Sequence, residues 1–162
     1  YLAASLQQLG DLRKAQKRLE DANAAYQESL NLRLALAREF PREASWRRLV
    51  ALSYALIKDL AAARSDLIGA IRAQREAAKL WDALLNEVPD SITEFAWFDS
   101  QLLLIELLLM QSADPASGAE ALALLERLRE YAQQHAKTLQ ARPDLIKELA
   151  RLQNRAEPKE TR

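Results

Sequence analysis

The feature that most constrains this chain is an internal repeat of 48 residues. Pro41 and Pro89 are 48 positions apart, and the same offset aligns about forty positions without a gap. The aligned pairs include Leu2 with Val50, Ala3 with Ala51, Ser5 with Ser53, Leu9 with Ile57, Asp11 with Asp59, Leu12 with Leu60, Leu19 with Leu67, Ala22 with Ala70, Leu36 with Leu84 and Glu39 with Glu87. A third, more degenerate copy runs from about Thr93 to Pro143 and holds an insertion of six residues. A repeat of this length indicates supersecondary units that stack and bury one another's apolar faces.

The composition predicts that each unit is helical. The sequence holds 30 Ala and 31 Leu but only 2 Val, 6 Ile and 3 Thr. Alanine and leucine lose little side-chain freedom in a helix, whereas strands favour β-branched and aromatic residues. With 3 Gly and 5 Pro in 162 residues there is also little turn chemistry for β-hairpins. We therefore expect an all-α chain.

Prolines mark where the helices are expected to break. Pro41, Pro89, Pro115 and Pro143 should each begin or end a helix. One straight helix filling a 40-residue segment would be about 60 Å long at 1.5 Å per residue, which favours a hairpin of two helices. The hairpin turns then fall within residues 13–19 and 61–66, although neither stretch contains Gly or Pro.

The sequence also predicts two N-terminal capping boxes and a short final helix. Ser91 with Glu94 and Ser117 with Glu120 have the spacing in which the two side chains satisfy free backbone amides at a helix start. Pro143 is predicted to open a short last helix that ends near Asn154.

Sequence motifs in the copies resemble the tetratricopeptide repeat. The first copy carries Leu6-x2-Leu9-Gly10 and then Ala22-x3-Tyr26-x2-Ser29. The second keeps Tyr54-x2-Ile57 and Ala70-x6-Ala77, and the third offers Leu102-x2-Ile105 and Ala121-x3-Leu125-x2-Leu128. Small residues at this spacing let two helices approach closely, while large ones fill the gap to the next pair. The long helices are most similar to those of bacterial multidomain signalling proteins and kinesin light chains.

The chain departs from that family's pattern at defined positions. Its period is 48 residues rather than the usual 34. The glycine that normally opens the second helix is Lys17 in the first copy and Ser65 in the second. In the second copy Lys58 replaces the glycine of the first helix, and Gln74 replaces the aromatic residue.

The resemblance implies a superhelical stack of about three helical hairpins, a solenoid like that of tetratricopeptide repeats, with a C-terminal capping helix. The alternative is an ordinary antiparallel helical bundle without solenoid stacking. We expect one domain over 1–156, with repeats at about 1–41, 42–89 and 90–143, a capping helix at 144–156 and a disordered tail at 157–162.

Few residues are available for chemistry. Lys+Arg and Asp+Glu are 23 each, so the chain lacks the basic excess that nucleic acids and anionic membranes attract. There is no cysteine for a thiol nucleophile or thiolate metal site, and the only histidine, His135, has no acidic partner at a recognisable spacing. The glycines stand alone, so none forms a phosphate-binding loop. We expect no enzyme activity, no cofactor and no metal.

A surface for holding another protein is therefore the main functional expectation. The resemblance implies that one face of each first helix lines a concave groove that accepts a helix or an extended segment. The candidate partner-binding residues are Gln7, Asp11, Lys14, Leu52, Asp59, Ser100, Leu103, Leu107, Met110 and Gln111. An alternative for Leu103, Leu107 and Met110 is burial beneath the last helix.

These observations predict a protein–protein interaction module, acting as an adaptor or sensor domain of a larger cytoplasmic protein. Its partner would be another protein or peptide, with neither nucleic acid nor membrane involved. Two other functions stay open: self-association through an exposed terminal repeat, forming a homo-oligomer, and regulation of an enzyme whose catalytic part lies outside this chain.

Overall fold

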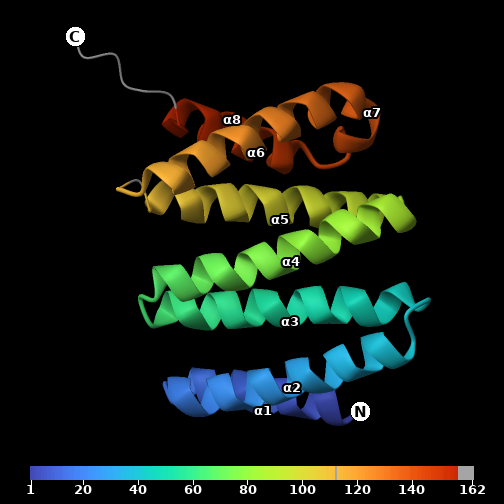
Figure 1. The fold of residues 1–162 in the computed structure, drawn as a ribbon, viewed down its shortest axis with the longest axis vertical. Helices are drawn as coiled ribbons and strands as arrows, with labels where there is room; N and C mark the ends of the chain where they lie inside the picture. The colour runs from blue at the N-terminus through green and yellow to red at the C-terminus, as the bar shows by residue number, and fades with distance from the viewer. Residues whose placement is uncertain (112, 157–162) are drawn as a thin grey trace. The chain divides into compact units, whose positions relative to one another are not determined.

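The fold is helical throughout the part of the chain that can be described. The computed structural model describes residues 1–111 and 113–156, and within them it forms eight helices and no strand (Figure 1). The predicted all-α class is confirmed, while superhelical stacking stays a prediction. The predicted tail at 157–162 lies outside the described residues. The chain separates into two compact units, Tyr1–Val88 and a second that begins at Pro89.

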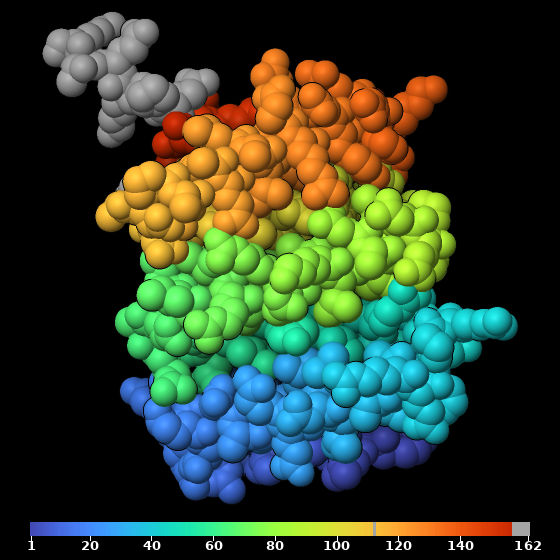
Figure 2. All heavy atoms as spheres, viewed as in Figure 1, coloured from blue at the N-terminus to red at the C-terminus, as the bar shows by residue number. Residues whose placement is uncertain are grey.

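Four helices make up the first unit. They are α1 (Leu2–Ala15), α2 (Leu19–Glu39), α3 (Ala44–Ala63) and α4 (Leu67–Glu87). Each helix packs on the next in chain order, so α2 contacts both α1 and α3. Figure 2 shows the atoms of α2, in blue, lying against those of α3, in cyan. α1 and α2 form one hairpin over residues 2–39, and α3 and α4 form the next over residues 44–87.

The hairpin turns repeat with the same offset of 48 residues. Lys17 and Ser65 have φ angles of 60° and 58°, the left-handed conformation that commonly ends a helix. The following amides donate to carbonyls five residues back, Arg18 to Arg13 and Asp66 to Ala61, both at 2.9 Å. Because these hydrogen bonds close the turn, the chain reverses without glycine or proline.

Gly10 makes room for the ring of Tyr26 between α1 and α2. A Cβ atom on Gly10 would lie 2.4 Å from Cε1 of Tyr26, so any side chain there would collide with the buried ring. The Tyr26 hydroxyl donates to Oδ1 of Asp11 at 2.6 Å. Burial, and then the Asp11 carboxylate, raise the pKa of Tyr26 well above its usual range. In the second hairpin, Lys58 stands at the position of Gly10 and Gln74 at the position of Tyr26. The glycine is thus replaced by a long side chain and the large ring by a smaller side chain.

Arg33 ties three helices together. Its buried guanidinium donates from Nη1 to Oγ of Ser53 on α3 at 2.6 Å and from Nη2 to Oε1 of Gln7 on α1 at 2.7 Å. Burial lowers the pKa of Arg33. Because both acceptors are neutral, the buried cation depends on these hydrogen bonds for compensation.

This arrangement predicts unequal effects for two serines related by the repeat. Ser53→Ala is expected to lower the free energy of unfolding by about 1–3 kcal/mol, because it removes an acceptor from a buried guanidinium. Ser5→Ala, at the equivalent exposed position, should change it by less than about 0.5 kcal/mol. Urea denaturation followed by circular dichroism measures both. Equal effects would show that the Arg33 contact is not stabilising.

Four more helices form the second unit, namely α5 (Ser91–Met110), α6 (Pro115–Gln134), α7 (Ala136–Leu139) and α8 (Pro143–Ala156). α5 packs against α6, and α8 contacts both. The largest fully buried apolar side chains in this unit are Trp97, Phe98, Ile105, Leu108, Leu128, Leu139 and Leu152. The last helix begins at the predicted proline, whereas the short α7 was not expected.

Two helix starts differ from the predicted capping boxes. The cap of α5 is Asp90, whose Oδ1 accepts from the Thr93 amide at 2.7 Å. The cap of α6 is Asp114, whose carboxylate accepts from the amides of Ala116 and Ser117, each at 3.2 Å. Aspartate is as good an N-cap as serine and its charge also suits the positive end of the helix dipole, so both helices begin earlier than the serines suggested.

Candidate interaction groove

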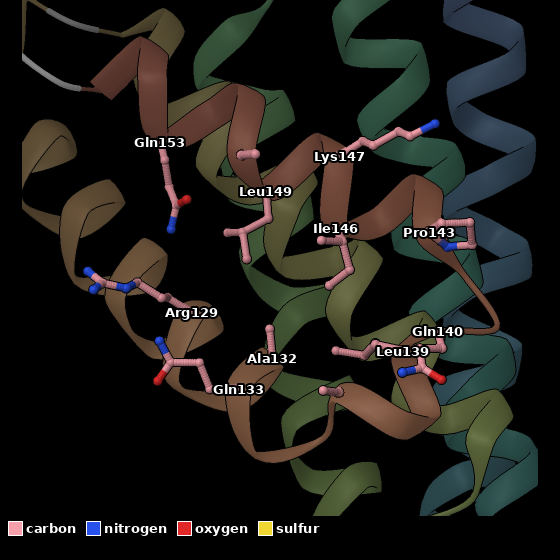
Figure 3. A pocket seen from close by; sticks show the side chains of 12 residues that line it. Arg129, Ala132, Gln133, Leu139, Gln140, Pro143, Ile146, Lys147, Leu149 and Gln153 are labelled. Carbon is pink, nitrogen blue, oxygen red and sulfur yellow. The ribbon is translucent and has the colours of Figure 1, made fainter.

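An open apolar cleft lies between α6 and α8 in the second unit. Its volume is about 650 Å³, and Figure 3 shows side chains from both helices and from α7 around it. The apolar part of its lining is Ala132, Ala136, Leu139, Pro143, Ile146, Leu149 and Ala150. The polar part is Arg129, Gln133, Gln140, Lys147 and Gln153, with no carboxylate. An apolar cleft of this size with a few polar groups is typical of a binding site.

The turn after α6 creates the cleft. α6 ends at Gln134, and the His135 ring stacks on the Tyr131 ring with 3.9 Å between centroids and 9° between planes. The four-residue α7 then leads away before Pro143 starts α8. Leu139, which is buried, anchors this detour. The two long helices are thereby held apart at this end.

α8 supplies the opposite wall because it is strongly amphipathic. Leu145, Leu149 and Leu152 recur at helical spacing and are buried, which fits the contacts of α8 with α5 and α6. Ile146 lies beside this stripe and remains partly exposed. Figure 3 shows Ile146 and Leu149 pointing toward α6 and α7 across the cleft. Ile146 therefore offers the cleft an apolar side chain that the core does not bury.

The cleft continues along α6 as a second hollow of about 460 Å³. Arg129 and Gln153 line both hollows, and exposed Leu122 lies at the far end of the second. From Leu122 to Gln133 the helix advances about 16 Å at 1.5 Å per residue. We call the two hollows together the α6–α8 groove; it is long enough for several residues of a peptide.

The charged residues that line the main cleft, Arg129 and Lys147, are both cationic. Arg129 pairs with Glu126 at 3.5 Å on the surface of α6. Lys147 lines the cleft with its stem, and Figure 3 shows its ammonium directed away from the cavity. The glutamine amides at positions 133, 140 and 153 can donate and accept hydrogen bonds at the mouth. The main cleft thus combines an apolar floor with neutral hydrogen-bonding groups and two cationic residues, and the second hollow adds the Glu126 carboxylate, which pairs with Arg129.

Aromatic side chains pack α6 against α5 in the same unit. The Tyr131 ring lies 4.5 Å from that of Trp97 on α5, and Arg127 lies 5.3 Å over the same Trp97 ring. Burial raises the pKa of Tyr131 well above its usual range, and the charge and hydrogen bond of Glu94 raise it further. Tyr131 is half-buried and packs α6 against the buried Trp97 ring of α5.

The predicted partner-binding residues of the first unit are spread over α1 and α3. Gln7 and Asp11 already accept hydrogen bonds from Arg33 and Tyr26 on α2. Leu52 and Asp59 are exposed on α3, with Asp59 2.7 Å from the Lys58 ammonium, and Lys14 is half-buried on α1. Gln7 and Asp11 therefore stabilise the packing of α1 on α2.

Those of the second unit lie on or just after α5. Ser100 is buried, Leu103 and Leu107 are half-buried, and Met110 is exposed. Gln111 accepts a hydrogen bond from the Ser117 hydroxyl at 3.2 Å. None of the ten predicted residues lines the α6–α8 groove, and their role in partner binding stays a prediction. The signal that could have found the groove is Ile146, an apolar residue outside the leucine stripe of α8.

Neither a metal-binding cluster nor a membrane-spanning helix is found among the described residues. Within 1–111 and 113–156, no three His, Cys, Asp or Glu side chains gather where a metal ion could be held. No helix of the described chain combines the length and apolar character needed to cross a membrane. Comparison with protein-family models, curated proteins and solved structures finds no match to this chain.

Proposed function

We propose that this chain is a protein–protein interaction module that binds an apolar peptide segment of another protein in the α6–α8 groove. The observation that carries the proposal is the 650 Å³ cleft, whose floor is apolar and whose lining includes no carboxylate. The resemblance of the repeats to tetratricopeptide motifs supports the same class of function. The module would act by binding alone, without chemistry.

Burial of apolar side chains would provide most of the binding free energy. Removing apolar surface from water contributes about 25 cal/mol per Å², part of which offsets the entropy lost on association. Large apolar side chains of the ligand seated beside Leu139 and Ile146 would contribute most of the affinity. The amides of Gln133 and Gln153 can pair with the peptide backbone, which fixes its orientation. An acidic residue in the ligand would compete with Glu126 for Arg129.

A substitution that fills the groove tests this proposal. Peptides selected from a random display library on the wild-type chain are measured against Ala150→Glu, which places a bulky carboxylate in the cleft at an exposed position of α8. We expect the selected peptides to bind this variant at least about tenfold more weakly, equivalent to 1.4 kcal/mol. Fluorescence polarisation of labelled peptides gives the dissociation constants.

Ala123→Glu is the matched control, because Ala123 is also an exposed helical alanine but does not line the groove. It should leave peptide affinity unchanged, and both variants should retain wild-type circular dichroism. If peptides bind wild type and Ala150→Glu equally, or if the library yields no binder, the groove is not the interaction site.

A further inference from the structure

The outer face of α1 exposes residues whose repeat counterparts are buried. Leu12 is 55% exposed while Leu60, its counterpart on α3, is 1% exposed. Leu2 is 63% exposed while its counterpart Val50 is 1% exposed. Leu9 is likewise exposed on α1. Because the two helices share the same register, α1 presents an apolar face of the kind that α3 buries.

On α3 the covering element is α2. Leu60 clusters with Ala22 and Tyr26 of α2, and Leu19 packs against the same cluster. Ile57 joins from α3, at the position equivalent to Leu9. The established α2·α3 interface therefore shows which kind of helix fits this face: one with a small residue and, four positions later, an aromatic ring.

A polar contact of the same interface has its counterpart on α1. The Ser53 hydroxyl donates to the Leu49 carbonyl at 2.9 Å and accepts from Arg33 of α2 at 2.6 Å. The Ser5 hydroxyl makes the equivalent backbone bond to the Tyr1 carbonyl, at 3.4 Å, but is exposed. Its position leaves it able to accept from an arginine placed as Arg33 is.

The surface hollows of the two hairpins agree with this. One hollow of about 240 Å³ lies between α1 and α2, and its eight lining residues map at the offset of 48 onto residues that line a 410 Å³ hollow between α3 and α4. The larger hollow is also lined by Asn23 and Gln27 from the covering helix α2. The hollow at α1 lacks such a wall.

We infer that the α1 face, defined as Leu2, Ser5, Leu9 and Leu12, docks a helix of the α2 type that belongs to a hairpin outside residues 1–162. The docking helix carries the α2 pattern: a small residue, a tyrosine four positions later and an arginine seven positions after the tyrosine. The small residue and the tyrosine would face Leu12, and the arginine would face Ser5. A second copy of this chain is not the occupant, because its own α2 face is already buried against α1 and α3. This surface shares no residue with the α6–α8 groove, and the inference does not depend on the proposed function.

A tandem chain supplies the missing helix directly. Residues 1–48 are placed ahead of the full chain, so that a second α2 precedes Tyr1 at the natural repeat spacing. We expect hydrogen exchange of the α1 amides in the full-length part to slow at least tenfold relative to the unextended chain, because packed helices open less often. Leu12→Lys in that part should abolish the slowing, since it buries a charge in the new interface.

Leu52→Lys is the matched control, because Leu52 is 51% exposed on α3 and lies outside the α2·α3 cluster. It should leave the slowing intact. No slowing in the tandem chain, or slowing that survives Leu12→Lys, would refute the docking of an α2-type helix. The unextended chain is examined by sedimentation: a dimer that Leu12→Lys dissociates would also overturn the inference, by making a second copy the occupant.

Discussion

Gly10→Ala is expected to lower the free energy of unfolding by about 1–2 kcal/mol, although alanine is the better helix former. The added Cβ would lie 2.4 Å from a ring carbon of Tyr26, and that ring is buried with its hydroxyl bound to Asp11. Overpacking a close-packed site costs about 1–3 kcal/mol, whereas the helix propensity of alanine recovers less than about 1 kcal/mol. Urea denaturation measures the difference.

Gly118→Ala provides the control, because a Cβ on Gly118 meets nothing within 4 Å. We expect this change to stabilise the protein by about 0.5–1 kcal/mol. In a Tyr26→Gln background, which reproduces the residue of the second hairpin, Gly10→Ala should cost less than about 0.5 kcal/mol. A cost that is unchanged in that background would show that the Tyr26 ring is not the obstacle.

Leu60→Ala is expected to cost about 3 kcal/mol, while Leu12→Ala at the equivalent position costs less than about 1 kcal/mol. Leu60 lies in the buried cluster with Ala22 and Tyr26, so truncation removes apolar contacts and leaves a cavity. Leu12 is exposed on α1 and loses little. Denaturant midpoints of the two variants, compared with wild type at equal slope, give the two values.

In the tandem chain, the small cost expected for Leu12→Ala should become large. Once an α2-type helix covers α1, Leu12→Ala in the full-length part should cost about as much as Leu60→Ala does in the natural chain. Leu52→Ala should cost little in either chain, because Leu52 stays exposed on α3. Equal and small costs for Leu60→Ala and Leu12→Ala in the natural chain would contradict the packing of α3 on α2.

Much of the local structure follows from short-range signals. Prolines at 89, 115 and 143 mark helix boundaries, and the offset of 48 residues relates the turns at Lys17 and Ser65. The helix caps were placed less well, because Asp90 and Asp114 compete with the nearby serines for the same amides. The short α7 has no proline or glycine at its start, so the break at His135 was not visible in the sequence.

The α6–α8 groove was beyond sequence reasoning for a different reason. Its walls come from helices whose separation depends on how α7 turns and on which face of α8 packs against α5 and α6. The leucine stripe of α8 identifies a buried face, but only the packed helices show that Ile146 is left beside a cleft. The ten residues predicted to bind a partner were chosen by repeat position, and none lines this groove.

The sequence by itself determined that the chain is helical, that its first two hairpins share one register, and where most helices begin and end. These properties depend on propensity, spacing and turn geometry within a few residues. Only the tertiary structure decided that Leu60 is core and Leu12 is surface, because burial depends on a covering helix that lies far away in the chain. For the same reason, only packing shows that Gly10 must be small: its neighbour is the ring of Tyr26, sixteen residues on.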